Sequence, residues 1–202
     1  MTASAQARIP GTATMNPYDF NLSLNLPFLG AYITDDIWGQ GLGHVVVARR
    51  GPSGKVVFAD FLVDVHCLGI KDFFLSCHKE ARFDGFLDEL GSRLGLKDIE
   101  PAFARKLLEE ATAYAEGLGF PTKPEVRSTM RLLHEADPAT CSEVFAFGKD
   151  GKPFYVSGPY DSAARRSEIV AALTKSCGEG HFDFLVHVGD AAPEFIKPQG
   201  RL

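Results

Sequence analysis

Three polar residues on one predicted strand face, Asp60, Asp64 and His66, are the strongest candidates for chemistry in this chain. They occupy even positions of the segment Lys55–Cys67, and alternate side chains of a strand share one face at a spacing of about 6.6 Å. Carboxylate and imidazole groups at that spacing suit a divalent cation such as Mn, Fe, Zn or hydrated Mg. We therefore treat these residues as candidate ligands of a divalent metal.

Two residues that follow this segment are candidate catalytic groups. Asp72 could supply a further metal ligand or a general base, and Lys71 could neutralise a phosphate or a developing oxyanion. With a metal bound, such groups would suit a hydrolase of the phosphodiesterase or nuclease type. The structural alternatives are a solvent-facing strand end, or carboxylates that pair with Arg49 and Arg50 of the neighbouring strand.

A second polar face occurs on the predicted last strand, His181–Val188. His181, Asp183 and His187 alternate with phenylalanine and valine, so the two sets point to opposite faces. If this strand lay beside Lys55–Cys67, His187 could activate water for the same hydrolysis. That assignment depends on strand order, which the sequence does not give.

Two predicted β-hairpins would position these residues. In the first, residues 44–50 and 55–67 flank a Gly-Pro-Ser-Gly turn, and every odd position of the second strand is apolar. This pattern predicts that the odd face forms one wall of the core. The second hairpin spans residues 143–157 and turns at Asp150-Gly151, a dipeptide typical of hairpins.

Apolar residues at helical spacing predict about four helices, over residues 83–94, 101–118, 122–133 and 161–176. Pro101 suits the first turn of the second helix, Thr122 with Glu125 predicts a capping box for the third, and Asp161 predicts the cap of the fourth. Strands separated by runs of helices are typical of an α+β fold. We expect a mainly antiparallel sheet built from the two hairpins and the C-terminal strand.

The chain is expected to form one domain. Its 202 residues and 45% hydrophobic content suit a single core over residues 15–190. Residues 1–14 are small and polar, which predicts a disordered tail, and Met15 could equally be the natural start. Residues 191–202 are Pro-rich at their centre and are expected to be irregular.

The net charge, the cysteine pattern and the lack of a long apolar run favour a cytoplasmic protein. The formal net charge of −5 argues against binding nucleic acid over a broad basic surface. None of the four cysteines forms a Cys-x-x-Cys pair, which favours a reducing cytoplasm. No apolar run approaches the roughly 18 residues that a membrane helix needs, so we expect a cytoplasmic protein without a membrane anchor.

Four segments form recognisable motifs: LVDVHCLGIKDFF (62–74), FGKDGKPFYVSGPYD (147–161), the preceding GLGHVVVARRGPSGKVVF and the closing GHFDFLVHV. On these motifs the chain resembles a group of bacterial proteins that has no established activity. The resemblance covers most of residues 25–188. It implies a bacterial, cytoplasmic, single-domain protein and assigns no catalytic residue.

Three functions are compatible with these features. The acidic charge and the lack of a recognised catalytic motif favour a non-enzymatic binding or accessory protein that acts through protein–protein contacts, because a Phe-rich chain can present an apolar surface patch. The second function is the metal-dependent hydrolase. The third is local binding of single-stranded nucleic acid by a basic group and an aromatic sheet face, made of Arg49, Arg50, Lys55, Phe145, Phe147, Phe154 and Tyr155.

Overall fold

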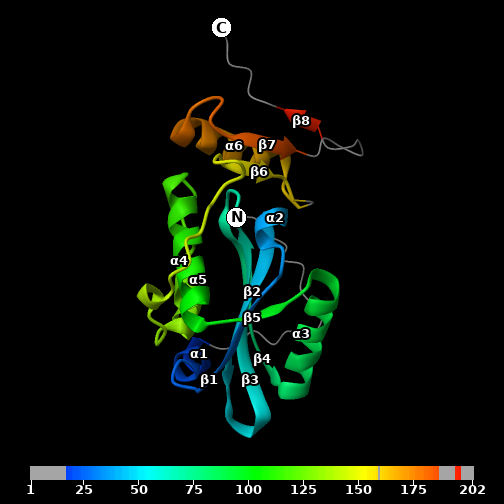
Figure 1. Cartoon of the computed structure of the whole chain (residues 1–202), viewed down its shortest axis with the longest axis vertical. Helices are drawn as coiled ribbons and strands as arrows, with labels where there is room; N and C mark the ends of the chain where they lie inside the picture. The colour runs from blue at the N-terminus through cyan, green and yellow to red at the C-terminus, as the bar shows by residue number, and fades with distance from the viewer. Residues whose placement is uncertain (1–16, 159, 187–193, 197–202) are drawn as a thin grey trace.

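The computed structural model describes residues 17–158, 160–186 and 194–196. Its main element is a five-stranded antiparallel sheet with the strand order β4-β3-β2-β1-β5 (Figure 1). The expected α+β class with a mainly antiparallel sheet is therefore confirmed. The strands are β1 Phe28–Ile33, β2 Leu42–Arg50, β3 Lys55–Asp64, β4 Gly69–Lys79 and β5 Lys97–Ile99.

The first predicted hairpin is confirmed as β2 and β3, which pair from Arg50↔Val56 to Leu42↔Asp64. After β3 the chain turns at residues 65–68 and returns as β4, a strand that we did not predict. β4 is only partly buried along most of its length, on both faces. Its sequence therefore lacks the clear apolar–polar alternation of a strand with one dry and one wet face.

Helices cover both faces of the sheet (Figure 1). On one face, α4 (Pro101–Gly117) packs Leu107 and Leu108 against the odd residues of β3, as the apolar pattern predicted. On the other face, α3 (Glu80–Leu94) packs Phe83 against the even residues Val56 and Phe58. The even face of β3 is therefore covered by a helix and is not a solvent-facing strand end.

The remaining helices are α1 Pro17–Ser23, α2 Ile37–Gln40, α5 Pro124–Met130 and α6 Ala163–Cys177. Two predicted caps are wrong. The side chain of Ser162 caps α6 by accepting a hydrogen bond from the backbone N–H of Arg165, in place of Asp161. The N-cap of α5 is Lys123, with no side-chain hydrogen bond, so Thr122 forms no capping box. None of the helices within the described ranges is long and apolar enough to cross a bilayer.

The second predicted hairpin is wrong. Lys149 and Lys152 form a single bridge around Asp150-Gly151, both of which have positive φ, and residues 141–147 form no strand. The alternate phenylalanines of this segment, which resembled a strand, instead pack on other aromatic rings. Phe145 stacks on Trp38, with ring centroids 5.7 Å apart, and Phe147 stacks on Tyr114 at 5.2 Å.

The predicted last strand lies in a separate small sheet. β6 (Phe154–Val156) pairs in parallel with β7 (Asp183–Val186), which pairs antiparallel with β8 (Glu194–Ile196). β7 is therefore not a neighbour of β3, whose partners are β2 and β4. β8 lies within the C-terminal stretch that we expected to be irregular, whereas the predicted tail at residues 1–14 lies outside the described residues.

The small sheet and α6 pack against the turn between β3 and β4. Cys67 of that turn belongs to the same apolar cluster as Tyr155, Leu173 and Phe182. Two backbone hydrogen bonds reinforce the contact: Gly148 N–H donates to the carbonyl of Val65, and Phe154 N–H donates to that of His66. Residues 65–68 therefore join the main sheet to the C-terminal part of the chain.

Candidate functional site

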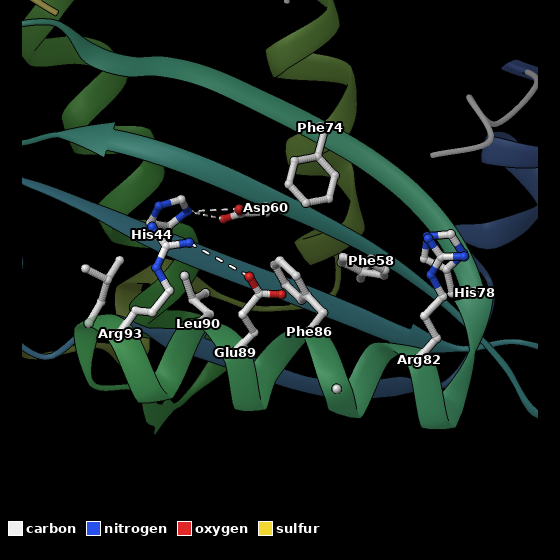
Figure 2. Close-up of a pocket in the computed structure, with 12 residues that line it drawn as sticks. His44, Phe58, Asp60, Phe74, His78, Arg82, Phe86, Glu89, Leu90 and Arg93 are labelled. Atoms are coloured by element: carbon white, nitrogen blue, oxygen red, sulfur yellow. Dashed lines mark hydrogen bonds and ion pairs between the residues drawn. The ribbon is translucent and has the colours of Figure 1, made fainter. Parts of the chain in front are cut away.

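A cleft of about 570 Å³ lies between α3 and the sheet face that this helix covers (Figure 2). Strands β2, β3 and β4 form its floor, and α3 forms its wall. Along α3 only Phe83, near the start of the helix, is fully buried, and Gly85 leaves open space beside the cleft. The apolar lining is provided by Phe58, Phe74, Phe86, Leu90 and Leu94, and the polar lining by His44, Asp60, His78, Arg82, Glu89 and Arg93.

A histidine–aspartate pair lies in the floor of the cleft. His44 Nδ1 is 3.0 and 2.9 Å from the two carboxylate oxygens of Asp60. The pair is diagonal across two strands, because Asp60 faces Val46 in the ladder and His44 lies two residues along on the same face. Asp60 is buried, with 4% of its surface exposed, whereas the His44 side chain is 26% exposed.

This arrangement fixes the orientation of the imidazole. With Nδ1 donating to Asp60, the other ring nitrogen, Nε2, has no hydrogen-bond partner among the described residues and can accept or donate in the cleft. The sequence reasoning missed His44 because its pairing with Asp60 depends on strand register. His44 could have been found from the predicted hairpin, because residues that lie diagonally across two paired strands on one face are close together.

The rim of the cleft carries the charged side chains of α3. Glu89 and Arg93 form a loose ion pair, 3.9 Å apart, in which both side chains are about three-quarters exposed, so the pair contributes little to stability. At the other end, His78 lies 3.0 Å from Ser76 Oγ. Partial burial, followed by the nearby Arg82, holds the pKa of His78 below its ordinary value.

The structure does not bring the three predicted metal ligands together. Asp60 pairs with His44, whereas Asp64 accepts hydrogen bonds from the backbone N–H groups of His66 and Cys67, at 3.0 and 2.8 Å. The His66 ring donates from Nε2 to the carbonyl of Trp38, 3.2 Å away. Within the described ranges, no group of three or more His, Cys, Asp or Glu residues is placed to hold a metal ion.

The predicted catalytic residues are also dispersed. Asp72 is exposed on β4, and its carboxylate accepts a hydrogen bond from the adjacent backbone N–H of Phe73 at 2.9 Å. Lys71, also on β4, lies close to Gly158 after β6 and attracts the carboxylate of Asp64. His187 lies outside the described residues.

The residues expected to bind nucleic acid do not share one exposed face. Arg49 is 1% exposed, and Tyr155 is buried and donates its hydroxyl hydrogen bond to Asp161. Phe145 and Phe147 are partly buried by the ring contacts described above, while Lys149 lies over the ring of Phe154. Only the basic side chains of Arg50 and Lys55 are exposed as that hypothesis requires.

Asp64 is expected to act on stability through the turn that it caps. Asp64→Ala should lower the free energy of unfolding by about 1–3 kcal/mol, because it leaves the buried N–H groups of His66 and Cys67 without their acceptor. Asp64→Asn keeps an acceptor oxygen and should cost less. Urea denaturation of both variants measures the difference, and equal losses would contradict this role.

The charge of Asp64 adds a pH dependence to this comparison. Burial raises the pKa of Asp64 above its ordinary value of 3.8, although hydrogen bonds from Cys67 and His66 and the charge of Lys71 oppose the shift. The folded state therefore binds the proton more tightly, so this contribution to stability is present below pH 3.8 and is lost as pH rises through the folded-state pKa. The Asp64→Asn variant does not titrate at this position. Its stability relative to the unmodified protein should therefore increase as the pH rises through the folded-state pKa of Asp64.

Comparisons with protein-family models, curated proteins and solved structures found no match for this chain. The resemblance drawn from the sequence motifs therefore stays a prediction. The function has to be inferred from the cleft and its residues.

Proposed function

We propose that the protein is a non-enzymatic binding protein that holds a small, largely apolar molecule in the cleft between α3 and the sheet. The cleft itself is the observation that supports this function best. Its volume of about 570 Å³ lies within the range of about 300–1,000 Å³ typical of ligand pockets. Its lining has the expected chemistry, with aromatic rings and a few convergent polar groups.

The polar groups of the cleft favour binding over covalent catalysis. An imidazole oriented by a carboxylate can serve as a general base, but covalent chemistry also needs a nucleophile beside it. The described residues that line the cleft include no serine, threonine or cysteine that His44 could activate. The same imidazole can fix the position of a ligand through one directional hydrogen bond.

Protein–protein contacts and a cytoplasmic location belong to this proposal as expectations from the sequence. The described residues do include exposed large apolar side chains that a partner could cover. They come from several elements and loops: Leu22, Trp38, Leu42, Leu94, Val144, Val156 and Tyr160. Of these, only Leu94 lines the cleft, which brings its apolar groups together in one concave site, so we base the function on the cleft.

A tryptophan placed at Gly85 should block the cleft. Gly85 lies inside α3 and lines the cleft, and a Cβ atom added there would meet no heavy atom within 4 Å. Gly85→Trp should therefore fold while its ring occupies the space of the ligand. We expect binding of the uncharged apolar dye Nile red, measured by fluorescence titration, to weaken at least tenfold, which is about 1.4 kcal/mol.

Gly117→Trp is the matched control. Gly117 ends α4, outside the cleft, and an added Cβ atom there also meets nothing within 4 Å. This variant should bind the dye with unchanged affinity, and circular dichroism should show that both variants are folded. The proposal fails if the unmodified protein shows no saturable binding, or if both variants bind the dye equally well.

A further inference from the structure

We propose that the molecule bound in this cleft is an apolar carboxylic acid, whose carboxylate is held by His44 and Arg93. Its alkyl or aryl body would lie over the aromatic floor. This inference rests on the proposed function, because it names the ligand class of the same cleft. Three features of the cleft support it: the oriented imidazole, the weakly engaged arginines and the separation of polar from apolar lining.

The first feature is the imidazole of His44. Both carboxylate oxygens of Asp60 lie within 3.0 Å of Nδ1, so the ring cannot turn without losing two contacts. When the ring is protonated, Nε2 carries the second N–H group and can donate it to an anion in the cleft. A ligand carboxylate would form a charge-assisted hydrogen bond there, of the stronger kind.

The second feature is the cationic rim. Arg93 belongs to the same end of the cleft as His44 (Figure 2), and its nearest acid, Glu89, is held only at 3.9 Å. A carboxylate in the cleft can therefore replace Glu89 without breaking a close ion pair. Arg82, at the other end, forms no ion pair among the described residues. Because Asp60 is already engaged by His44, Glu89 is the remaining acid among the described residues of the lining, and the other polar groups, His44, His78, Arg82 and Arg93, can donate hydrogen bonds.

The third feature is the apolar surface between these two ends, to which Phe58 and Phe74 contribute from the floor and Phe86 contributes from α3. The ring of Phe86 contacts that of Phe58, with centroids 5.2 Å apart, and that of Phe74, with centroids 5.8 Å apart. Leu90 continues this surface toward the end of α3 (Figure 2). An apolar body would be removed from water against these rings, at roughly 25 cal/mol per Å² of buried area. An inorganic anion would not use this apolar surface.

Decanoate and decanol test the inference, because they share one carbon chain and differ in charge. Each would displace Nile red from the cleft, with decanoate kept below its micelle concentration and decanol below its solubility limit. We expect decanoate to compete at least tenfold more strongly than decanol with the unmodified protein. His44→Gln and Arg93→Gln should each reduce this preference severalfold and leave competition by decanol unchanged.

A second test variant and a control variant make the outcome decisive. Arg93 is an exposed helix residue, so Arg93→Gln keeps the fold even if His44→Gln, which leaves Asp60 with a weaker partner, does not. Arg165 is an exposed arginine of α6, and Arg165→Gln should change the competition of neither decanoate nor decanol. The inference is overturned if decanol competes as well as decanoate, or if Arg93→Gln leaves the preference intact. In either case, the proposed function would still stand if the unmodified protein binds the dye and Gly85→Trp blocks that binding. If the unmodified protein does not bind the dye, the proposed function and the ligand class both fail.

Discussion

Replacing Arg49 by alanine is expected to lower the free energy of unfolding by about 3–5 kcal/mol, because it empties a buried, fully engaged cation site. Arg49 is a large side chain with 1% of its surface exposed. Its Nε donates to the carbonyl of Leu132 at 2.8 Å, one terminal nitrogen donates to the carbonyl of Leu26, and the other pairs with Glu135 at 2.9 Å. Alanine would leave both carbonyls without a donor and open a cavity.

These partners explain why the effect should be large. Leu26 lies just before β1, and Leu132 and Glu135 follow α5, so one side chain of β2 joins two distant segments. The buried carbonyl of Leu132 costs about 1–3 kcal/mol when it loses its donor, the partly buried carbonyl of Leu26 costs less, and the cavity adds to both. Equilibrium unfolding in urea would measure the sum as a lower midpoint with an unchanged slope.

Arg50 provides the matched control at the next position. It points to the opposite face of β2, its side chain is 53% exposed, and its partner Glu80 is 43% exposed. Arg50→Ala should therefore change stability by no more than about 1 kcal/mol. If Arg49→Ala and Arg50→Ala destabilise the protein equally, the buried contacts of Arg49 do not contribute as we infer.

The two arginines also show what the sequence could and could not predict. The alternative that carboxylates of β3 pair with Arg49 and Arg50 is wrong, because Arg49 pairs with Glu135 and Arg50 pairs with Glu80. Side-chain alternation along the strand indicated only that the two arginines point to opposite faces. It did not show that the sheet face at Arg49 is covered by residues from positions 131–135. Contacts that join residues more than 80 positions apart depend on topology, and local sequence patterns carry no information on it.

The candidate site was predictable only in part, because its local elements follow sequence patterns and its long-range contacts do not. The helical spacing in α3 predicted the helix that forms the wall of the cleft. The apolar odd positions of β3 predicted the opposite face of the sheet, which packs on α4 and does not line the cleft. The metal hypothesis selected Asp60, but it placed Asp64 and His66 in the same site. Their hydrogen bonds show that they instead hold the turn between β3 and β4. Polar residues at the end of a strand can equally serve as turn caps, and spacing alone does not separate these roles.

Alternating aromatic residues were the most misleading signal. Phe145 and Phe147 follow a two-residue period, which is typical of a strand with one buried face. The same period fits any extended segment that packs one side against the protein, and here Trp38, Phe103 and Tyr114 provide the packing surface. Periodicity predicts which side of a segment is buried. It does not predict whether the backbone joins a sheet.

Gly69→Ala is expected to lower the free energy of unfolding by about 2–5 kcal/mol, because Gly69 sets the distance between β4 and α4. Its φ is +63°, where an alanine is strained. A Cβ atom added there would lie 2.6 Å from the carbonyl oxygen of Ala111 and 2.7 Å from the Cβ of Ala115. Neither neighbour is the end of a flexible side chain, so α4 itself would have to move away from the sheet.

Gly54→Ala separates these two costs. Gly54 has nearly the same φ, +66°, but a Cβ atom added there meets nothing within 4 Å. It should therefore show only the backbone strain, about 1–2 kcal/mol. The excess loss in Gly69→Ala measures the close contact of helix and strand. If urea denaturation gives the same loss at both positions, α4 can shift without cost, and the turn that joins the two parts of the chain is less tightly packed than these distances imply.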